Sequence, residues 1–113
     1  MAQTTPKLEG IIQSFRRQLE RMGIRAERIM LFGSHATGSA QEGSDIDLIV
    51  VSNDWGDLNQ RERLELLGVA AARILEPIQA QGFTSEEIFN RNVTPFWEFI
   101  LSKQAVEIDL LVT

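Results

Sequence analysis

Two apolar segments that lie close together in the chain constrain its fold more than any other feature. Residues 28–32 and 45–52 are dominated by isoleucine, leucine, valine, methionine and phenylalanine. Such runs indicate buried strands, and the second suits a central strand that is covered on both faces. Only about a dozen residues separate them, which is short for a crossover connection with a full helix of its own. A mixed β-sheet with helices packed on it is therefore expected.

Helical periodicity predicts one long helix before these strands and another after them. The first should end at Gly23, and its apolar side chains share one face. These side chains are Leu8, Ile11, Ile12, Phe15, Leu19 and Met22. The second helix is expected over residues 59–75, because Pro77 follows. Its inward-facing side chains are expected to be Leu64, Leu67, Ala71 and Ile74.

The last third of the chain is predicted to add two strands and two short helices. The strands are expected at residues 78–83 and 105–112. Thr84, with Glu87 three residues later, forms a capping box that should begin one helix. Thr94, which a proline follows, should cap the other. The core side of that helix is expected to comprise Phe96, Trp97, Ile100 and Leu101.

The composition agrees with one globular domain of the α/β class, in its α+β form, over residues 1–113. The chain is 43% apolar and 24% charged, as ordinary soluble domains are. It has no cysteine, which excludes disulfides and thiolate metal sites, and a lone His35, which excludes a multi-histidine zinc site. No apolar run could cross a bilayer and no signal-peptide pattern begins the chain, so a cytoplasmic protein is expected.

The net charge of −5 argues against broad, non-specific binding to nucleic acid, which depends on clustered basic residues. The arginines near the first helix alternate with glutamates and are interpreted as a solvated face rather than a phosphate-binding patch. They are Arg16, Arg17, Arg21, Arg25 and Arg28. An acidic protein that handles a polyphosphate must neutralise charge locally, most simply with a divalent cation.

Two aspartates at the start of the second strand are the first element of a candidate site. Alternate residues of a strand point to the same face, so Asp45 and Asp47 should project side by side while Ile46 enters the core. Two carboxylates so close repel one another, and a divalent cation relieves that repulsion. Mg²⁺ held there could align a triphosphate, neutralise its charge and activate an attacking hydroxyl.

The turn after the first strand is the second element. Gly33 lets the backbone approach a ligand without a Cβ in the way, and Ser34 offers a hydroxyl and an amide to phosphate oxygens. Each motif alone has an ordinary explanation, since Asp-x-Asp occurs by chance and Gly-Ser after a strand is usually only a turn. Both motifs in this order, next to these strands, are much more specific.

Together these residues resemble the signature of the DNA polymerase β-like nucleotidyltransferase superfamily, most closely its minimal, stand-alone prokaryotic members. The residues that carry the resemblance are Leu31, Phe32, Gly33, Ser34, Ala36 and Gly38, followed by Ser44, Asp45, Ile46, Asp47 and Leu48. The resemblance implies the polymerase β-like fold, a mixed sheet flanked by helices. It also implies Mg²⁺-dependent transfer of a nucleoside monophosphate, with AMP from ATP as the expected case, and release of pyrophosphate.

Carried over residue by residue, the resemblance assigns roles within the two motifs. Gly33, Ser34 and Ser44 would bind the nucleotide. Asp45 and Asp47 would be catalytic and would hold one or two Mg²⁺ ions.

Two positions depart from the pattern of that superfamily. His35 stands where many members have arginine after Gly-Ser, and it could either touch phosphate or be an ordinary turn residue. Many members also supply a third carboxylate from the next strand, where this chain has Gln79 and Gln81. An amide is a poorer metal ligand and cannot act as a base. Asp109 could substitute, although an exposed carboxylate at a strand end is the favoured interpretation.

The sequence leaves three hypotheses of different classes. The first is an enzyme that transfers AMP to a protein or RNA acceptor, such as the antitoxin-like member of a two-gene pair that acts with a small helical partner protein. The second is a catalytically weak or inactive nucleotide-binding module that works with such a partner, which the missing third acid favours. The third is an unrelated metal-binding α/β domain, for which both motifs would have to coincide by accident.

A chain of 113 residues leaves little surface to enclose a base and a ribose, so a second subunit could complete the site. Trp55, Phe96 and Trp97 are candidates for the contact surface, although core packing is the favoured interpretation of Phe96. The sequence does not decide between a helical partner and a homo-oligomer, and it does not identify the acceptor.

Overall fold

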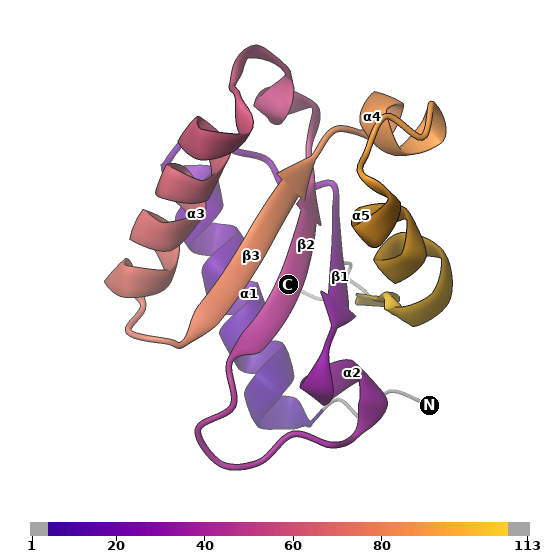
Figure 1. The fold of residues 1–113 in the computed structure, drawn as a ribbon. Coiled ribbons are helices and arrows are strands. Elements are labelled where there is room, and N and C mark those ends of the chain that lie inside the picture. Colours follow the sequence, from indigo (N-terminus) through magenta and orange to yellow (C-terminus); the bar gives the residue numbers. More distant parts are fainter. Residues whose placement is uncertain (1–4, 109–113) are drawn as a thin grey trace.

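The computed structural model describes residues 5–108, which contain a mixed four-stranded sheet (Figure 1). The strands are β1 (Arg28–Phe32), β2 (Ile46–Val51), β3 (Ile78–Phe83) and β4 (Val106–Ile108). Their order across the sheet is β3-β2-β1-β4. β1 is antiparallel to both β2 and β4, whereas β2 and β3 are parallel. The expected mixed sheet is thus confirmed, with the β1–β2 connection too short for a long crossover helix.

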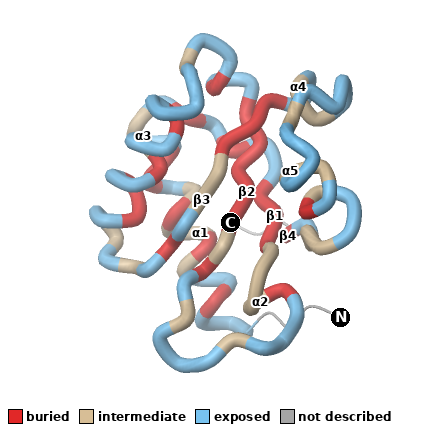
Figure 2. The backbone as a smooth tube through the Cα atoms, viewed as in Figure 1, coloured by how far each residue is buried: buried red, intermediate tan, exposed pale blue. Residues whose placement is uncertain are grey.

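Helices cover both faces of the sheet (Figure 1). α1 (Pro6–Arg21) and α3 (Gln60–Arg73) enclose the larger core cluster on one face. On the other face, the smaller cluster is enclosed by α4 (Ser85–Phe89), α5 (Pro95–Phe99) and the π-helical turn η2 (Ile100–Gln104). Figure 2 shows buried positions concentrated along the strands, while α4 and α5 are largely exposed. No helix within residues 5–108 is long and apolar enough to cross a membrane.

Most of the predicted elements lie where the sequence places them. The strands at 28–32 and 78–83 have the predicted bounds, and the side chains of Thr84 and Glu87 form the predicted reciprocal capping box. The second strand begins one residue later than predicted, so Asp45 precedes it. Of the last predicted strand, residues 106–108 are strand, while Asp109 lies outside the described residues.

Two large apolar residues do not lie as predicted, and a third, Trp55, which the sequence leaves open between the core and a contact surface, lies in the core. Leu64 and Phe96 were expected to face the core, but 47% and 59% of their surfaces are exposed. Both line a cavity beside β3 instead of filling the interior. Trp55, a candidate for a contact surface, is completely buried in the 3-10 helix η1 (Asn53–Asp57). Its Nε1 donates a hydrogen bond of 3.0 Å to the Val50 carbonyl, so burial leaves no unpaired polar atom on the ring.

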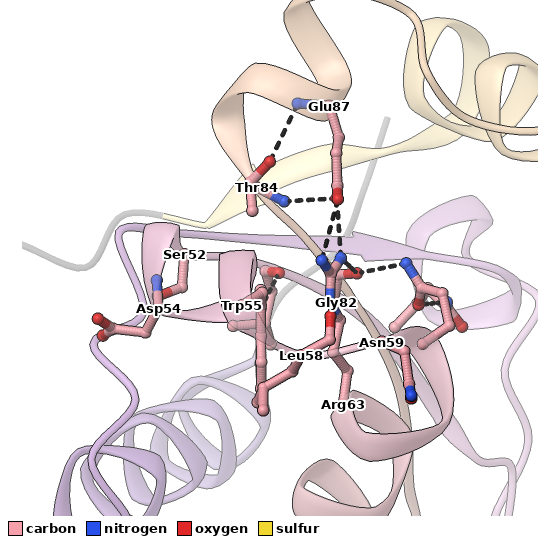
Figure 3. Close-up of polar contacts among 12 residues, drawn as sticks. Ser52, Asp54, Trp55, Leu58, Asn59, Arg63, Gly82, Thr84 and Glu87 are labelled. Carbon is pink, nitrogen blue, oxygen red and sulfur yellow. Dashed lines mark hydrogen bonds and ion pairs between the residues drawn. The ribbon is translucent and has the colours of Figure 1, made fainter.

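A buried arginine joins α3 to the far end of β3, where α4 begins (Figure 3). The Arg63 side chain is only 4% exposed and donates two hydrogen bonds, of 2.8 and 2.9 Å, to the Glu87 carboxylate. It also donates to the carbonyls of Leu58 and Gly82, at 2.9 and 3.1 Å. The Arg63 cluster, as we call Arg63 with these partners and Thr84, therefore satisfies its buried charges internally.

Candidate active site

The two aspartates lie where β2 begins, beside the end of β1 and the start of β3. Asp47 is paired with Phe32 on one side and with Gln79 on the other. Asp45 is exposed and Asp47 is half-buried. Burial raises the pKa of the Asp47 carboxyl above its ordinary value of 3.8, the Asp45 carboxylate raises this pKa further, and His35 lowers it. The two carboxylates are thus close enough to repel one another.

The turn after β1 lies directly against one of these aspartates. Gly33 has φ 72° and ψ −151°, a conformation that essentially only glycine adopts. A Cβ on Gly33 would overlap Oδ2 of Asp47. Glycine is therefore required here both by the backbone conformation and by the close approach of the carboxylate.

A short helix, α2 (Ser34–Thr37), follows this turn. Its first helical hydrogen bonds run from the amides of Ala36 and Thr37 to the Gly33 carbonyl. Ser34 and His35 are the first two residues of α2. At the N-terminus of a helix the backbone amides have no intrahelical acceptor. Those amides could therefore donate to phosphate oxygens that lie beside Asp47.

The loop between α2 and β2 is tied together around Ser44. The Ser44 hydroxyl accepts a hydrogen bond of 2.9 Å from the Gln41 amide, and the Ser44 carbonyl lies 3.5 Å from His35 Nε2. The histidine therefore bridges α2 and the segment that leads into Asp45. This contact gives His35 a role in holding the loop, whereas a contact between His35 and phosphate stays a prediction.

The two glutamines of β3 have different partners. Gln79 donates a hydrogen bond of 2.9 Å from Nε2 to Oδ2 of Asp45, across 34 residues of sequence. Gln81 instead donates to Oε1 of Gln60 on α3, at 2.6 Å. Of the two amides that stand where a third carboxylate is expected, Gln79 is thus the one that hydrogen-bonds to an aspartate of the site, Asp45.

The donor set of the site fits a divalent cation such as Mg²⁺. Asp45 and Asp47 are two neighbouring carboxylates next to free amides, and Mg²⁺ combines one or two carboxylates with phosphate oxygens and water. Within residues 5–108, no group of three or more histidine, aspartate or glutamate side chains converges on a common point. A cation bound here would therefore depend on the bound nucleotide for further ligands.

A cavity of about 440 Å³ opens beside Asp47 and Gln79. One wall is aromatic, with the rings of Phe32 and Trp97 packed edge to face at 5.4 Å and Phe96 packed on Trp97 at 5.1 Å. Sequence reasoning missed this cavity, because Phe96 and Trp97 were predicted to lie on the core side of their helix or at a contact surface, and neither prediction places a cavity beside β3. The positions of Phe96 and Trp97 on α5 gave no signal that a cavity would open between this helix and the first residues of β3.

The match to a protein family covers most of the chain. The family described as the nucleotidyltransferase domain matches residues 11–113. A comparison with curated proteins found no match.

Two solved structures share the fold. One is a toxin–antitoxin crystallised with AMP-PNP, which has 24% sequence identity and a TM-score of 0.58, with 88% of this chain and 70% of that chain covered. The other is a protein from Sulfolobus solfataricus, named as a nucleotidyltransferase by inference, with 19% identity and a TM-score of 0.53. The alignment covers 95% of this chain and 89% of that one. At these identities the likeness concerns the fold.

Proposed function

The chain belongs to the nucleotidyltransferase domain family, and from this premise we propose that it transfers AMP from Mg²⁺-bound ATP to a hydroxyl group of a protein or RNA acceptor. The acceptor hydroxyl would attack the α-phosphorus and release its proton to solvent, the bond from that phosphorus to the bridging oxygen would break, and pyrophosphate would leave. The observation that carries the proposal is the contact between Gly33 and Asp47, which joins a turn suited to phosphate with a carboxylate pair suited to a metal.

Each part of the site has a separate task in this reaction. Asp45 and Asp47 would hold Mg²⁺, which supplies charge neutralisation and polarises the reacting oxygens when it is bound. Gly33 and Ser34 would bind the triphosphate through the turn and its amides, and Ser44, in the loop before Asp45, would bind the nucleotide with them. The fixed strand positions of the aspartates supply the orientation on which such a transfer depends.

We further propose that the acceptor is a small helical partner protein, with this chain as the antitoxin-like member of a two-gene pair. The similar toxin–antitoxin structure supports this role, since it contains an ATP analogue. The cavity beside Asp47 is open to solvent at Phe96 and Leu64, which would let an acceptor side chain approach the α-phosphate.

A second candidate function is a nucleotide-binding module with little or no turnover. The observation that favours it is the Gln79 amide at the aspartates, because an amide cannot accept the proton of the attacking hydroxyl. Such a module would bind Mg²⁺-ATP and a partner protein without modifying it.

One assay separates these candidates. The protein is incubated with Mg²⁺, ATP labelled at the α-phosphate and a purified helical partner or RNA. Asp45→Asn, Asp47→Asn and a matched control, Asp57→Asn, are tested in parallel; Asp57 is exposed and lies in η1, away from the site.

Transfer of label that only the two site variants lose supports the enzyme. Saturable Mg²⁺-ATP binding without transfer supports the module. Absence of Mg²⁺-ATP binding in the wild type would refute both.

A further inference from the structure

Gln79 supplies an amide at a position where a carboxylate would be the better metal ligand. Parallel pairing sets Gln79 directly opposite Asp47, and its Nε2 donates to Oδ2 of Asp45 at 2.9 Å. Gln79 is therefore the backbone neighbour of one aspartate and the hydrogen-bond donor of the other. An N–H group cannot ligate a cation, and the oxygen that accepts from it has one lone-pair direction already used.

The number of available oxygens sets the number of cations. Two divalent ions about 4 Å apart, as in two-metal centres, need enough carboxylate oxygens to serve both. Here the pair supplies four oxygens, one of which is engaged by Gln79. No third acid converges on the pair within the described part of the chain, from residue 5 to residue 108.

We infer that Gln79 restricts the site to a single divalent ion and fixes the orientation of the Asp45 carboxylate for that ion. This inference rests on the proposed function, since it assumes that the aspartates bind a metal with the nucleotide. It makes Gln79 a positioning residue: it does not touch the reacting atoms but decides how Asp45 is presented. The consequence is a site that grips one Mg²⁺ with the triphosphate and has no place for a second.

Gln81 provides a matched comparison on the same strand. It lies two residues further along β3, and its Nε2 donates to Gln60 rather than to an aspartate. A glutamate at position 81 therefore adds the same charge to the same strand without placing a carboxylate against Asp45. The two substitutions, Gln79→Glu and Gln81→Glu, separate the local effect of Gln79 from a general effect of added negative charge.

The experiment counts Mn²⁺ ions bound to the full chain by electron paramagnetic resonance, with a non-hydrolysable ATP analogue present. After subtraction of Mn²⁺ bound to the free analogue, we expect about one ion per chain in the wild type and in Gln81→Glu, and roughly two in Gln79→Glu. This readout needs neither an acceptor nor turnover.

Two ions in the wild type, or one ion in Gln79→Glu, would overturn the inference while leaving the proposed function intact. A second ion in Gln81→Glu as well would also overturn it, because added charge rather than position would then be the cause. If the wild type bound no Mn²⁺ beyond that on the free analogue, the inference and the proposed function would fall together.

Discussion

Acidic side chains of neighbouring elements lie near the two ends of β3, in opposite circumstances: Glu87 of α4 at one end and Asp47 of β2 at the other. At the far end, Glu87 faces the buried guanidinium of Arg63, whose hydrogen bonds lower the pKa of Glu87 below its ordinary value of 4.5 (Figure 3). At the near end, Asp47 faces another carboxylate, and burial together with Asp45 raises its pKa. The fold neutralises the first carboxylate itself, whereas the opposing effect of His35 on the second is smaller than those of burial and Asp45.

This difference separates a structural cluster from a candidate active site. An internally paired charge contributes to stability and has no remaining demand for a ligand. A carboxylate pair without a counter-ion costs stability, and a bound cation would remove that cost. A carboxylate pair without a strong cationic partner in a cleft is therefore the better indication of a functional site. The ion pair between Arg63 and Glu87 instead holds α3 and α4 together.

The largest expected effect lies at the Arg63 cluster. Arg63→Ala should lower the free energy of unfolding by about 3 kcal/mol or more, because it removes the buried guanidinium that donates to the Glu87 carboxylate and to the carbonyls of Leu58 and Gly82. Urea unfolding followed by circular dichroism measures the loss. The control is Arg61→Ala: Arg61 is 87% exposed and lies 3.8 Å from Glu65. We expect that change to cost within about 0.5 kcal/mol, and equal losses in the two variants would contradict the structural role of Arg63.

Two glycines, one near each end of β3, test the contrast between the structural cluster and the candidate active site. Gly82→Ala would press a Cβ against the buried Trp55 ring, and Gly33→Ala would press one against Asp47. We expect each to destabilise the chain by about 1–3 kcal/mol. Only Gly33→Ala should also weaken Mg²⁺-ATP binding, as measured by calorimetry at a temperature where both variants stay folded.

Gly10→Ala is the control for the two glycine substitutions, because Gly10 lies on α1 and an added Cβ there meets no atom within 4 Å. It should stabilise the chain by roughly 0.5–1 kcal/mol. If Gly82→Ala weakened nucleotide binding as much as Gly33→Ala, the separation between the two ends of β3 would be wrong.

The features that the sequence predicts well are those decided within a few residues. Runs of apolar residues mark β1 and β2, and Thr84 with Glu87 marks the start of α4, because each signal lies within its own element. The closeness of the turn to Asp47 also follows from a local connection, since β1 and β2 are consecutive antiparallel strands.

The features that the sequence could not predict depend on partners far along the chain. Arg63 and Glu87 are 24 residues apart, and Gln79 and Asp45 are 34 residues apart. Both contacts exist because β3 is parallel to β2 at the edge of the sheet, which no local pattern specifies. The exposure of Phe96 has the same origin, since it depends on how α5 sits over that edge. The functional roles of Asp45 and Asp47 stay predictions.

A smaller effect is expected when the repulsion within the aspartate pair is removed. Asp47→Asn should raise the free energy of unfolding by roughly 0.5 kcal/mol at pH 7 without Mg²⁺, because a partly buried charge beside Asp45 disappears. Saturating Mg²⁺-ATP should reverse the order, since only the wild type gains stability from the ligand. Thermal unfolding with and without Mg²⁺-ATP measures both, and a variant less stable than the wild type in the metal-free state would contradict the prediction.

The pH dependence of stability should distinguish the two carboxylates by the sign of its slope. The folded chain holds the Asp47 proton more tightly than the unfolded chain does, so this group makes stability fall as pH rises through the window just above 3.8. Glu87 has a lowered pKa, so its contribution is present above 4.5 and is lost as pH falls through the folded value. Urea unfolding of the wild type, Asp47→Asn and Glu87→Gln between pH 3 and 7 tests both signs. As pH falls, the free energy of unfolding of the wild type should lose its excess over that of Glu87→Gln. Its deficit relative to Asp47→Asn should shrink over the same range. If these two differences changed with pH in the same direction, one carboxylate would have been assigned the wrong environment.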